Sequence, residues 1–178
     1  YTLGIYASIA TPATIVQSAA TWLYTPTITV FTRNYIGKNK KAYFSLFTKI
    51  IALLAAVFAV ILAGAALLGH WGLDLLFGDE IAGYSSLLIP VLLTTLLIAL
   101  SYFSGALLTI TRKLKVLLVA NAAAAVLTLT LSRPLIQAFG MNGVNYVIYI
   151  AMGVNALILL AALLLILKAH FDKPEIQS

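Results

Sequence analysis

Hydroxyl side chains recur at helical spacing near the beginning of the sequence. Spacings of three or four residues place them on one face of a helix, and the series is Thr11, Thr14, Ser18, Thr21, Thr25, Thr29 and Thr32. Gln17 lies beside this series, and Pro12 and Pro26 favour kinks within the same stretch. The pattern favours a helix that lines a water-filled cavity. Hydrogen bonding between membrane helices is the alternative.

Two later stretches also carry polar residues at helical spacing. One contains Asn121, Ala125, Thr128 and Ser132, followed by Arg133, and the other contains Asn142, Asn145, Tyr149, Met152 and Asn155. Amides in hydrocarbon are costly unless paired, so both faces are expected to point toward other helices or water. Arg133 has two interpretations: it reaches the outer headgroups, or it attracts an anionic substrate group.

The sequence carries none of the common catalytic motifs. It has no cysteine, no nucleophile elbow, no zinc-protease motif and no glycine-rich phosphate loop, and its two histidines are far apart. We therefore predict a protein that is not an enzyme and that needs neither cofactor nor metal. The basic residues at 38–41 lack interleaved aromatic residues, which favours anionic lipid headgroups over nucleic acid as their partner.

The composition requires a membrane environment. Of the 178 residues, 62% are hydrophobic and only 9% are charged, whereas a soluble domain carries about 25% charged residues. Long uncharged runs of about 20 residues are typical of membrane-spanning helices. They predict one all-α transmembrane domain over residues 1–178, a bundle of about five helices at residues 5–32, 50–73, 84–111, 114–132 and 143–168. The second and third of these are expected to be scaffold or lipid-facing.

Loop charges predict the orientation of these spans. Every basic residue except Arg133 falls in alternate connections or in the C-terminal tail, where Lys168 and Lys173 lie. The positive-inside rule then places those connections and the C-terminus in the cytoplasm and the start of the chain outside. The chain does not begin with methionine, and it has an odd number of predicted spans with its start outside. We therefore expect it to be a piece of a longer chain.

The order of several short motifs resembles that of a known transporter family. They are Gly-Ile-Tyr-Ala-Ser at 4–8, Lys-Asn-Lys-Lys at 38–41, Leu-Phe-Gly-Asp-Glu at 76–80, Gly-Ala-Leu-Leu at 105–108 before Arg112 and Lys113, and Gly-Met-Asn-Gly at 140–143. In this order they are similar to the Wzx-like polysaccharide-unit (O-antigen) flippases of the multidrug/oligosaccharidyl-lipid/polysaccharide exporter superfamily. The resemblance covers essentially the whole chain.

The resemblance implies helices eight to twelve of a twelve-helix exporter, most of its C-terminal lobe. Such proteins move undecaprenyl-pyrophosphate-linked oligosaccharide units across the bacterial cytoplasmic (inner) membrane by alternating access, for surface polysaccharide synthesis. The implied partners are the lipid-linked oligosaccharide, membrane lipids, the N-terminal lobe of the same chain and polysaccharide polymerase machinery, without nucleic acid. The residues expected to contact substrate are Thr14, Gln17, Ser18, Thr21, Thr25, Asn121, Arg133 and Asn145.

Two other functions remain open on the sequence. A drug/cation antiporter of the same superfamily would share the fold and predicts a titratable acid within a span, yet the five acids lie in loops or in the tail. A membrane scaffold without transport activity, or a component of a membrane polymerase or ligase, is the alternative from a different class.

Overall fold

The described part of the chain is entirely helical apart from short turns. A computed structural model describes residues 2–172, except for the side chains of residues 2, 3, 5 and 6. The tail charges Lys173 and Glu175 lie outside the described residues. In chain order the elements are α1 Thr2–Tyr24, η1 Thr25–Thr27, α2 Ile28–Ile36, α3 Lys40–Phe77, α4 Asp79–Ala82, η2 Ser85–Leu87, α5 Leu88–Ile110, α6 Leu114–Phe139 and α7 Met141–Phe171.

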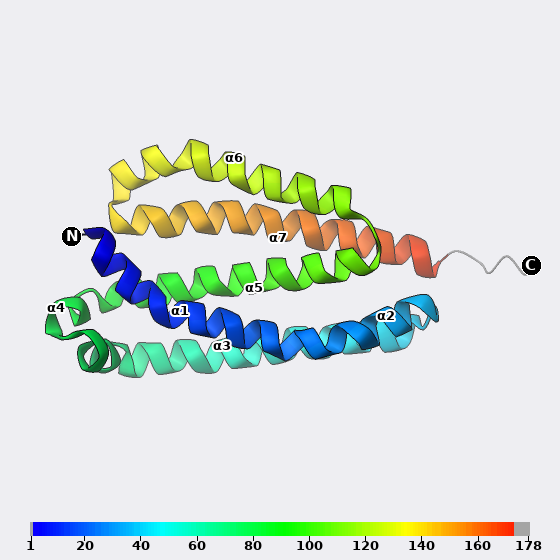
Figure 1. The fold of residues 1–178 in the computed structure, drawn as a ribbon, viewed down its shortest axis with the longest axis horizontal. Coiled ribbons are helices and arrows are strands. Elements are labelled where there is room, and N and C mark those ends of the chain that lie inside the picture. The colour runs from blue at the N-terminus through cyan, green and yellow to red at the C-terminus, as the bar shows by residue number, and fades with distance from the viewer. Residues whose placement is uncertain (1, 173–178) are drawn as a thin grey trace, which may run out of the picture.

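The long helices run side by side along one elongated bundle (Figure 1). The segment α1–η1–α2 lies along α3 and α5, while α6 folds back onto α7. Four helices are long and apolar enough to cross a membrane: α3, α5 extended by η2, α6 and α7. The prediction of an all-α membrane bundle is therefore confirmed.

The first expected span differs from these four helices. Residues 5–32 are divided among α1, the 3-10 turn η1 that contains Pro26, and α2. Proline lacks the backbone N–H that a continuing α-helix needs, which accounts for the change of helix type at this point. α1 also carries several hydroxyls and Gln17, and it is not among the four apolar spans.

Two other helices extend beyond the residues predicted for them. α3 begins at Lys40 rather than near residue 50, because the Asn39 side chain accepts a hydrogen bond from the Ala42 N–H at 3.0 Å and caps the helix. α6 continues past residue 132, through Pro134, to Phe139. It ends at Gly140, whose φ of +57° suits glycine and begins the turn into α7. Arg133 therefore lies within a helix rather than in a loop.

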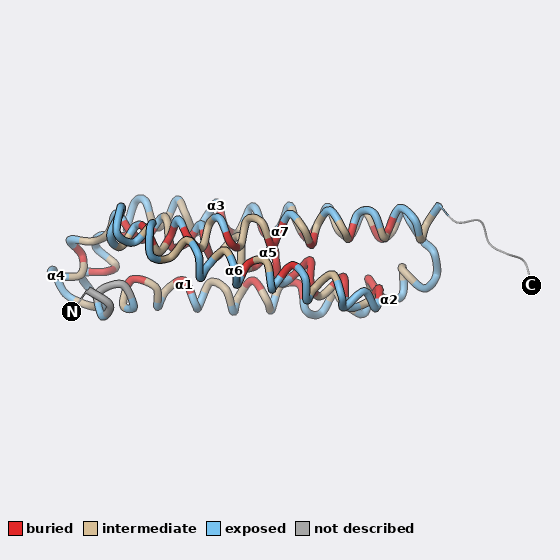
Figure 2. Tube along the Cα trace, turned by 90° about the horizontal axis from the view of Figure 1, so that it is seen from above, coloured by how far each residue is buried: buried red, intermediate tan, exposed pale blue. Residues whose placement is uncertain are grey.

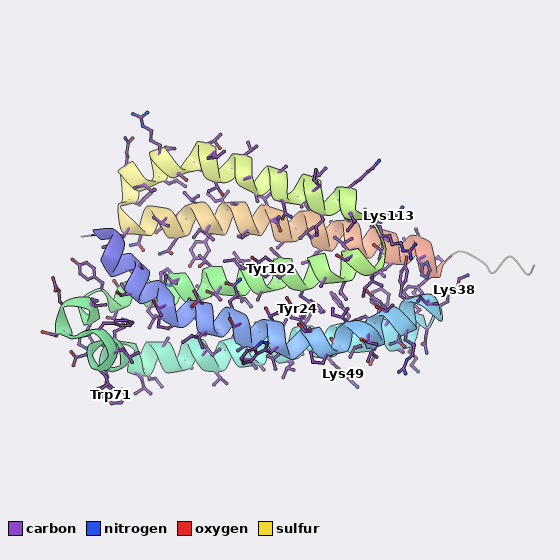
Figure 3. The ribbon with its side chains drawn as sticks, viewed as in Figure 1. Tyr24, Lys38, Lys49, Trp71, Tyr102 and Lys113 are labelled. Atoms are coloured by element: carbon purple, nitrogen blue, oxygen red, sulfur yellow. The ribbon has the colours of Figure 1, made fainter. Side chains whose placement is uncertain are left out.

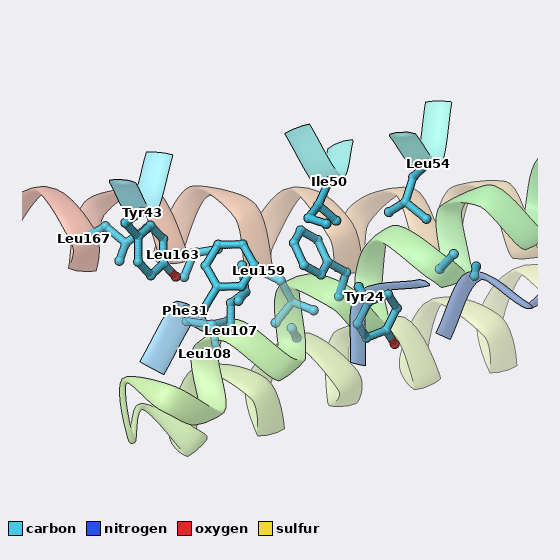
Figure 4. Packing of buried hydrophobic residues seen from close by; sticks show 14 of the residues in the cluster. Tyr24, Phe31, Tyr43, Ile50, Leu54, Leu107, Leu108, Leu159, Leu163 and Leu167 are labelled. Carbon is cyan, nitrogen blue, oxygen red and sulfur yellow. The ribbon is translucent and has the colours of Figure 1, made fainter. Parts of the chain in front are cut away.

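Aromatic and leucine side chains hold α1–α2, α3, α5 and α7 together (Figure 4). The Phe31 ring lies 5.0 Å from that of Tyr43 and 5.9 Å from that of Phe103, and all three residues are fully buried. Leu163 and Leu167 of α7 complete this cluster. A second, smaller cluster near the other end joins Ile9, Leu73, Leu88 and Val91.

Helix α6 lies on the outside of the bundle and packs on α7. Its buried residues are the alanines Ala120 and Ala124, which let the two helices approach closely. Leu118 and Leu129 of α6 are exposed, and Figure 2 shows exposed positions along much of this helix. An exposed apolar surface of this kind is typical of a helix that faces lipid.

Charged residues are divided between the two ends of the bundle. The α2–α3 and α5–α6 connections and the end of α7 lie at one end, called here the basic end, and α4 and the α6–α7 turn lie at the other, the acidic end (Figure 1). The basic end carries Arg33, Lys38, Lys40, Lys41, Lys49, Arg112, Lys113, Lys115 and Lys168 with the acid Asp172, and the acidic end carries Asp74, Asp79 and Glu80 with the base Arg133. The loop charges therefore segregate in space.

Candidate functional site

The seven-residue series on α1–α2, called here the hydroxyl face, is largely uncovered in this chain. Thr11, Thr14, Ser18, Thr25 and Thr29 are exposed, and Gln17, Thr21 and Thr32 are half-buried. Buried Ala13, Ala20 and Tyr24 fasten the other side of α1 to the bundle, and the Tyr24 ring lies 5.3 Å from that of Phe103. Helix α1 thus turns these residues inward and presents hydroxyls outward, together with the exposed side chains of Ile15 and Trp22.

The hydroxyls on this face donate to carbonyls of their own helix. Thr14 donates to the Thr11 carbonyl at 2.8 Å, Ser18 to the Thr14 carbonyl at 3.0 Å and Thr21 to the Gln17 carbonyl at 3.1 Å. Thr25 follows the same pattern at 2.6 Å. Each hydroxyl oxygen keeps lone pairs that can accept a further hydrogen bond. Within the described residues these hydroxyls bond to their own helix, so the face is open to a ligand, to water or to a further helix.

The hydroxyl face ends beside a cation near the basic end. Thr29, Thr32 and Arg33 line an open pocket of 630 Å³ together with Ile28, Ile36 and Gly37. Arg33 and Thr29 are exposed, so a guanidinium and two hydroxyls are available at the same opening. Such a set of groups suits a ligand with both negative charge and hydroxyl groups.

An amide pair joins α6 to α7. The Asn155 side-chain nitrogen donates to Asn121 Oδ1 at 3.0 Å, and Asn155 is 2% exposed whereas Asn121 is exposed. Pockets of 330 Å³ and 260 Å³ lie on either side of this bond, and both are lined by Asn121, Met152 and Asn155. Asn121 can therefore reach a ligand in either pocket while it remains bonded to Asn155.

Helix α5 contributes polar groups to the larger of these pockets. Ser101, Tyr102 and Thr109 line it, and Ser101 Oγ is buried with no hydrogen-bond partner among the described residues. The sequence interpretation treated this helix as scaffold or lipid-facing and so missed these residues. Thr109 follows Tyr102 by seven residues and Ser101 by eight, and both spacings return to the same face of a helix. This periodicity in the sequence could have identified the three residues.

The remaining predicted residues lie apart from these pockets. Arg133 is exposed in α6 toward the acidic end, twelve residues from Asn121, and a helix rises about 1.5 Å per residue, so the two are about 18 Å apart. Asn145 is completely buried in α7. The structure thus joins Asn121 with Asn155, and Thr29 and Thr32 with Arg33, but it does not gather all eight predicted residues in one place.

Helix α7 is fastened to α2 and α3 at the basic end. His170 Nε2 lies 2.9 Å from the Tyr35 carbonyl oxygen, and the two rings stack with centroids 3.9 Å apart. Burial raises the pKa of the Tyr35 phenol above its ordinary value, so it stays neutral and uncharged beside the imidazole. Lys40 Nζ pairs with Asp172 Oδ1 at 2.8 Å, and this hydrogen bond and charge lower the pKa of Asp172, so the pair persists down to acidic pH.

Comparisons with known proteins do not assign the chain to a family. No family model matches it, and no curated protein and no solved structure matches it either.

The amide pair makes a testable contribution to the packing of α6 on α7. Asn121→Ala and Asn155→Ala are each expected to lower the free energy of unfolding by about 1 kcal/mol, and the double variant by less than the sum, because both single changes remove the same hydrogen bond. Reversible unfolding in mixed micelles measures the three values. Thr128→Ala on the same helix is the control, since Thr128 bonds only within α6. Strictly additive losses would show that the bond contributes nothing.

Proposed function

We propose that the protein is a transporter that moves undecaprenyl-pyrophosphate-linked oligosaccharide units from the inner to the outer leaflet of the bacterial cytoplasmic membrane. The task requires no bond to be made or broken. It requires a path on which a sugar and pyrophosphate headgroup can cross hydrocarbon without losing its hydrogen-bond partners. The lipid tail remains in the bilayer during this movement.

The observation that carries this proposal is the exposed hydroxyl face on an otherwise apolar bundle. The described helices present mainly leucine, valine and alanine outward, whereas the α1–η1 segment presents Thr14, Ser18 and Thr25 beside Ile15 and Trp22. Hydroxyl groups facing hydrocarbon would gain nothing from their free lone pairs. On a water-filled face opposite a second lobe, these lone pairs can accept hydrogen bonds from sugar hydroxyls.

The other residues have separate roles in this proposal. Asn121, beside its two pockets, binds a sugar hydroxyl from α6, and Gln17 and Thr21 extend the hydroxyl face. Arg133 attracts the pyrophosphate at the acidic end. Asn145 is buried in the conformation described, so in this proposal it meets substrate only in a conformation that exposes this part of α7.

The orientation in this proposal rests on the charges at the two ends. By the positive-inside rule, the proposed transporter has its basic end, with the end of α7, in the cytoplasm and its acidic end outside. In this proposal the hydroxyl face lies opposite an N-terminal lobe of the same chain, and alternating access exposes the path to each leaflet in turn. Polysaccharide polymerase machinery then takes up the delivered unit.

A vesicle assay tests the function directly. Full-length protein is reconstituted with a fluorescently labelled lipid-linked oligosaccharide, and a membrane-impermeant lectin reports the fraction in the outer leaflet over time. We expect exposure faster than in protein-free vesicles. Equal rates would contradict the proposal. Ion-driven export of a cationic dye without movement of the oligosaccharide would identify an antiporter instead. If the protein shows neither activity, the membrane scaffold is the remaining function.

Arg133 provides a test of the charge role within the same assay. Arg133→Ala is expected to slow translocation about fivefold, because one exposed charge-assisted contact contributes about 1 kcal/mol. Arg133→Lys keeps the charge and is expected to retain most of the rate. If both variants translocate at the original rate, the side chain only reaches the outer headgroups and has no part in transport.

A further inference from the structure

A pocket at the basic end brings together residues from three parts of the chain. It has a volume of 370 Å³ and is lined by Tyr35 of α2, Lys113 of the α5–α6 turn, and Leu165, Ile166, Ala169 and His170 of α7. Figure 3 shows Lys113 where the α5–α6 turn meets the last turns of α7. The lining is thus cationic and aromatic on one side and aliphatic on the other.

Lys113 supplies positive charge at a favourable place. It is exposed and directly precedes α6, a helix of 26 residues. The first backbone N–H groups of a helix have no partner within it, and the helix dipole adds partial positive charge there. The ammonium group is therefore the charge that lines the pocket, and the nearby helix end adds to the positive potential at this end of the bundle.

His170 is held in place on the opposite wall. A carbonyl oxygen only accepts hydrogen bonds, so the 2.9 Å contact with the Tyr35 carbonyl requires Nε2 to carry the proton. The stacked Tyr35 ring fixes the orientation of the imidazole. Nδ1 is then the ring nitrogen left to meet a ligand in the pocket.

The surroundings attract anions and also offer an apolar surface. The acid described at this end is Asp172, which is paired with Lys40, whereas Lys168, Lys115 and Arg112 add positive charge nearby. On α7 the pocket continues into lipid-exposed leucines, with Leu165 69% and Leu164 47% exposed. A ligand that fits both features has a negatively charged head and a hydrocarbon chain.

We propose that this pocket binds one anionic phospholipid of the surrounding membrane. Its phosphate lies between Lys113 and His170, and one acyl chain lies along Leu164 and Leu165. The lipid joins the α5–α6 turn to the end of α7 at the basic end. This binding does not depend on the identity of the transported substrate. It differs from general attraction to the membrane because only one lysine of the basic end, Lys113, lines the pocket.

Native mass spectrometry of the delipidated protein tests the proposal. The protein in detergent is titrated with phosphatidylglycerol, phosphatidylcholine or inorganic phosphate, and the Kd of the first bound lipid is measured. We expect the first phosphatidylglycerol to bind more tightly than phosphatidylcholine. Lys113→Gln is expected to weaken that first binding about fivefold, since a basic residue at a lipid surface contributes about a factor of five.

Lys49→Gln is the matched control, because it removes the same charge from an exposed position on α3 outside this pocket (Figure 3). Its first Kd is expected to be unchanged. Equal weakening by both variants would mean diffuse attraction and would overturn the proposal, as would equal binding of the two lipids. Displacement of the phospholipid by inorganic phosphate at equal concentration would show that the pocket takes phosphate alone and would overturn the lipid assignment.

Discussion

Replacing Gly143 by alanine is expected to lower the free energy of unfolding by about 2–3 kcal/mol, in the upper part of the range of about 1–3 kcal/mol for overpacking. Gly143 is buried in the first turn of α7, directly against the end of α6. A Cβ atom there would lie 2.6 Å from the Leu135 carbonyl carbon and 2.7 Å from the Ile136 Cα. These are backbone atoms, so no side chain can turn aside and the two helices must separate.

Gly153→Ala is the matched control for this change. Gly153 lies in the same helix, and a Cβ there would meet nothing within 4 Å. Alanine is the better helix former, so we expect unchanged or slightly higher stability. Reversible unfolding in mixed micelles compares the two variants. Equal stability of both would contradict the close contact between α6 and α7 at Gly143.

Replacing Ser18 and Thr21 together by valine is expected to reduce oligosaccharide translocation about tenfold. The loss follows from two missing acceptors on the transport path, each of which contributes about 0.5–1.5 kcal/mol. Stability is expected to change by less than about 0.5 kcal/mol, because both hydroxyls donate to their own helix and neither is buried. The translocation assay in vesicles and unfolding in micelles measure the two quantities separately.

Thr48→Val separates this effect from a general effect of removing a hydroxyl. Thr48 is exposed on α3 and donates to the Phe44 carbonyl at 3.0 Å, the same bond that the α1 hydroxyls make. Translocation by this variant is expected to be unchanged. Lost stability with normal translocation in the Ser18 and Thr21 variant would instead assign these hydroxyls to packing between helices.

The helical bundle could be predicted from the sequence because uncharged runs of spanning length have few other solutions in a membrane. The turn at Gly140 and the division of loop charges between two ends follow from the same simple signals. The exact ends of helices could not be predicted. The early start of α3 depends on one capping contact from Asn39, and the continuation of α6 through Pro134 depends on packing against α7.

The candidate site was only partly predictable. Helical spacing identified the hydroxyl face and the stripe with Asn121, because it depends on local periodicity alone. Spacing does not show which helices meet, so it gave neither the bond from Asn155 to Asn121 nor the contribution of Ser101 from α5. It placed Asn145 on a polar stripe expected to point toward other helices or water, and packing of α7 buries this side chain completely.

Cysteine accessibility measures most directly whether the hydroxyl face is wet in the membrane. The chain has no cysteine, so single replacements at Thr14, Ser18 and Thr25 need no altered background. Val60→Cys and Leu67→Cys, at exposed apolar positions of α3, are the controls. In intact membranes we expect a water-soluble thiol reagent to label the three positions of the hydroxyl face and to spare the α3 positions. Absence of labelling at all three positions of the hydroxyl face, with labelling recovered in denatured protein, would contradict a water-filled path.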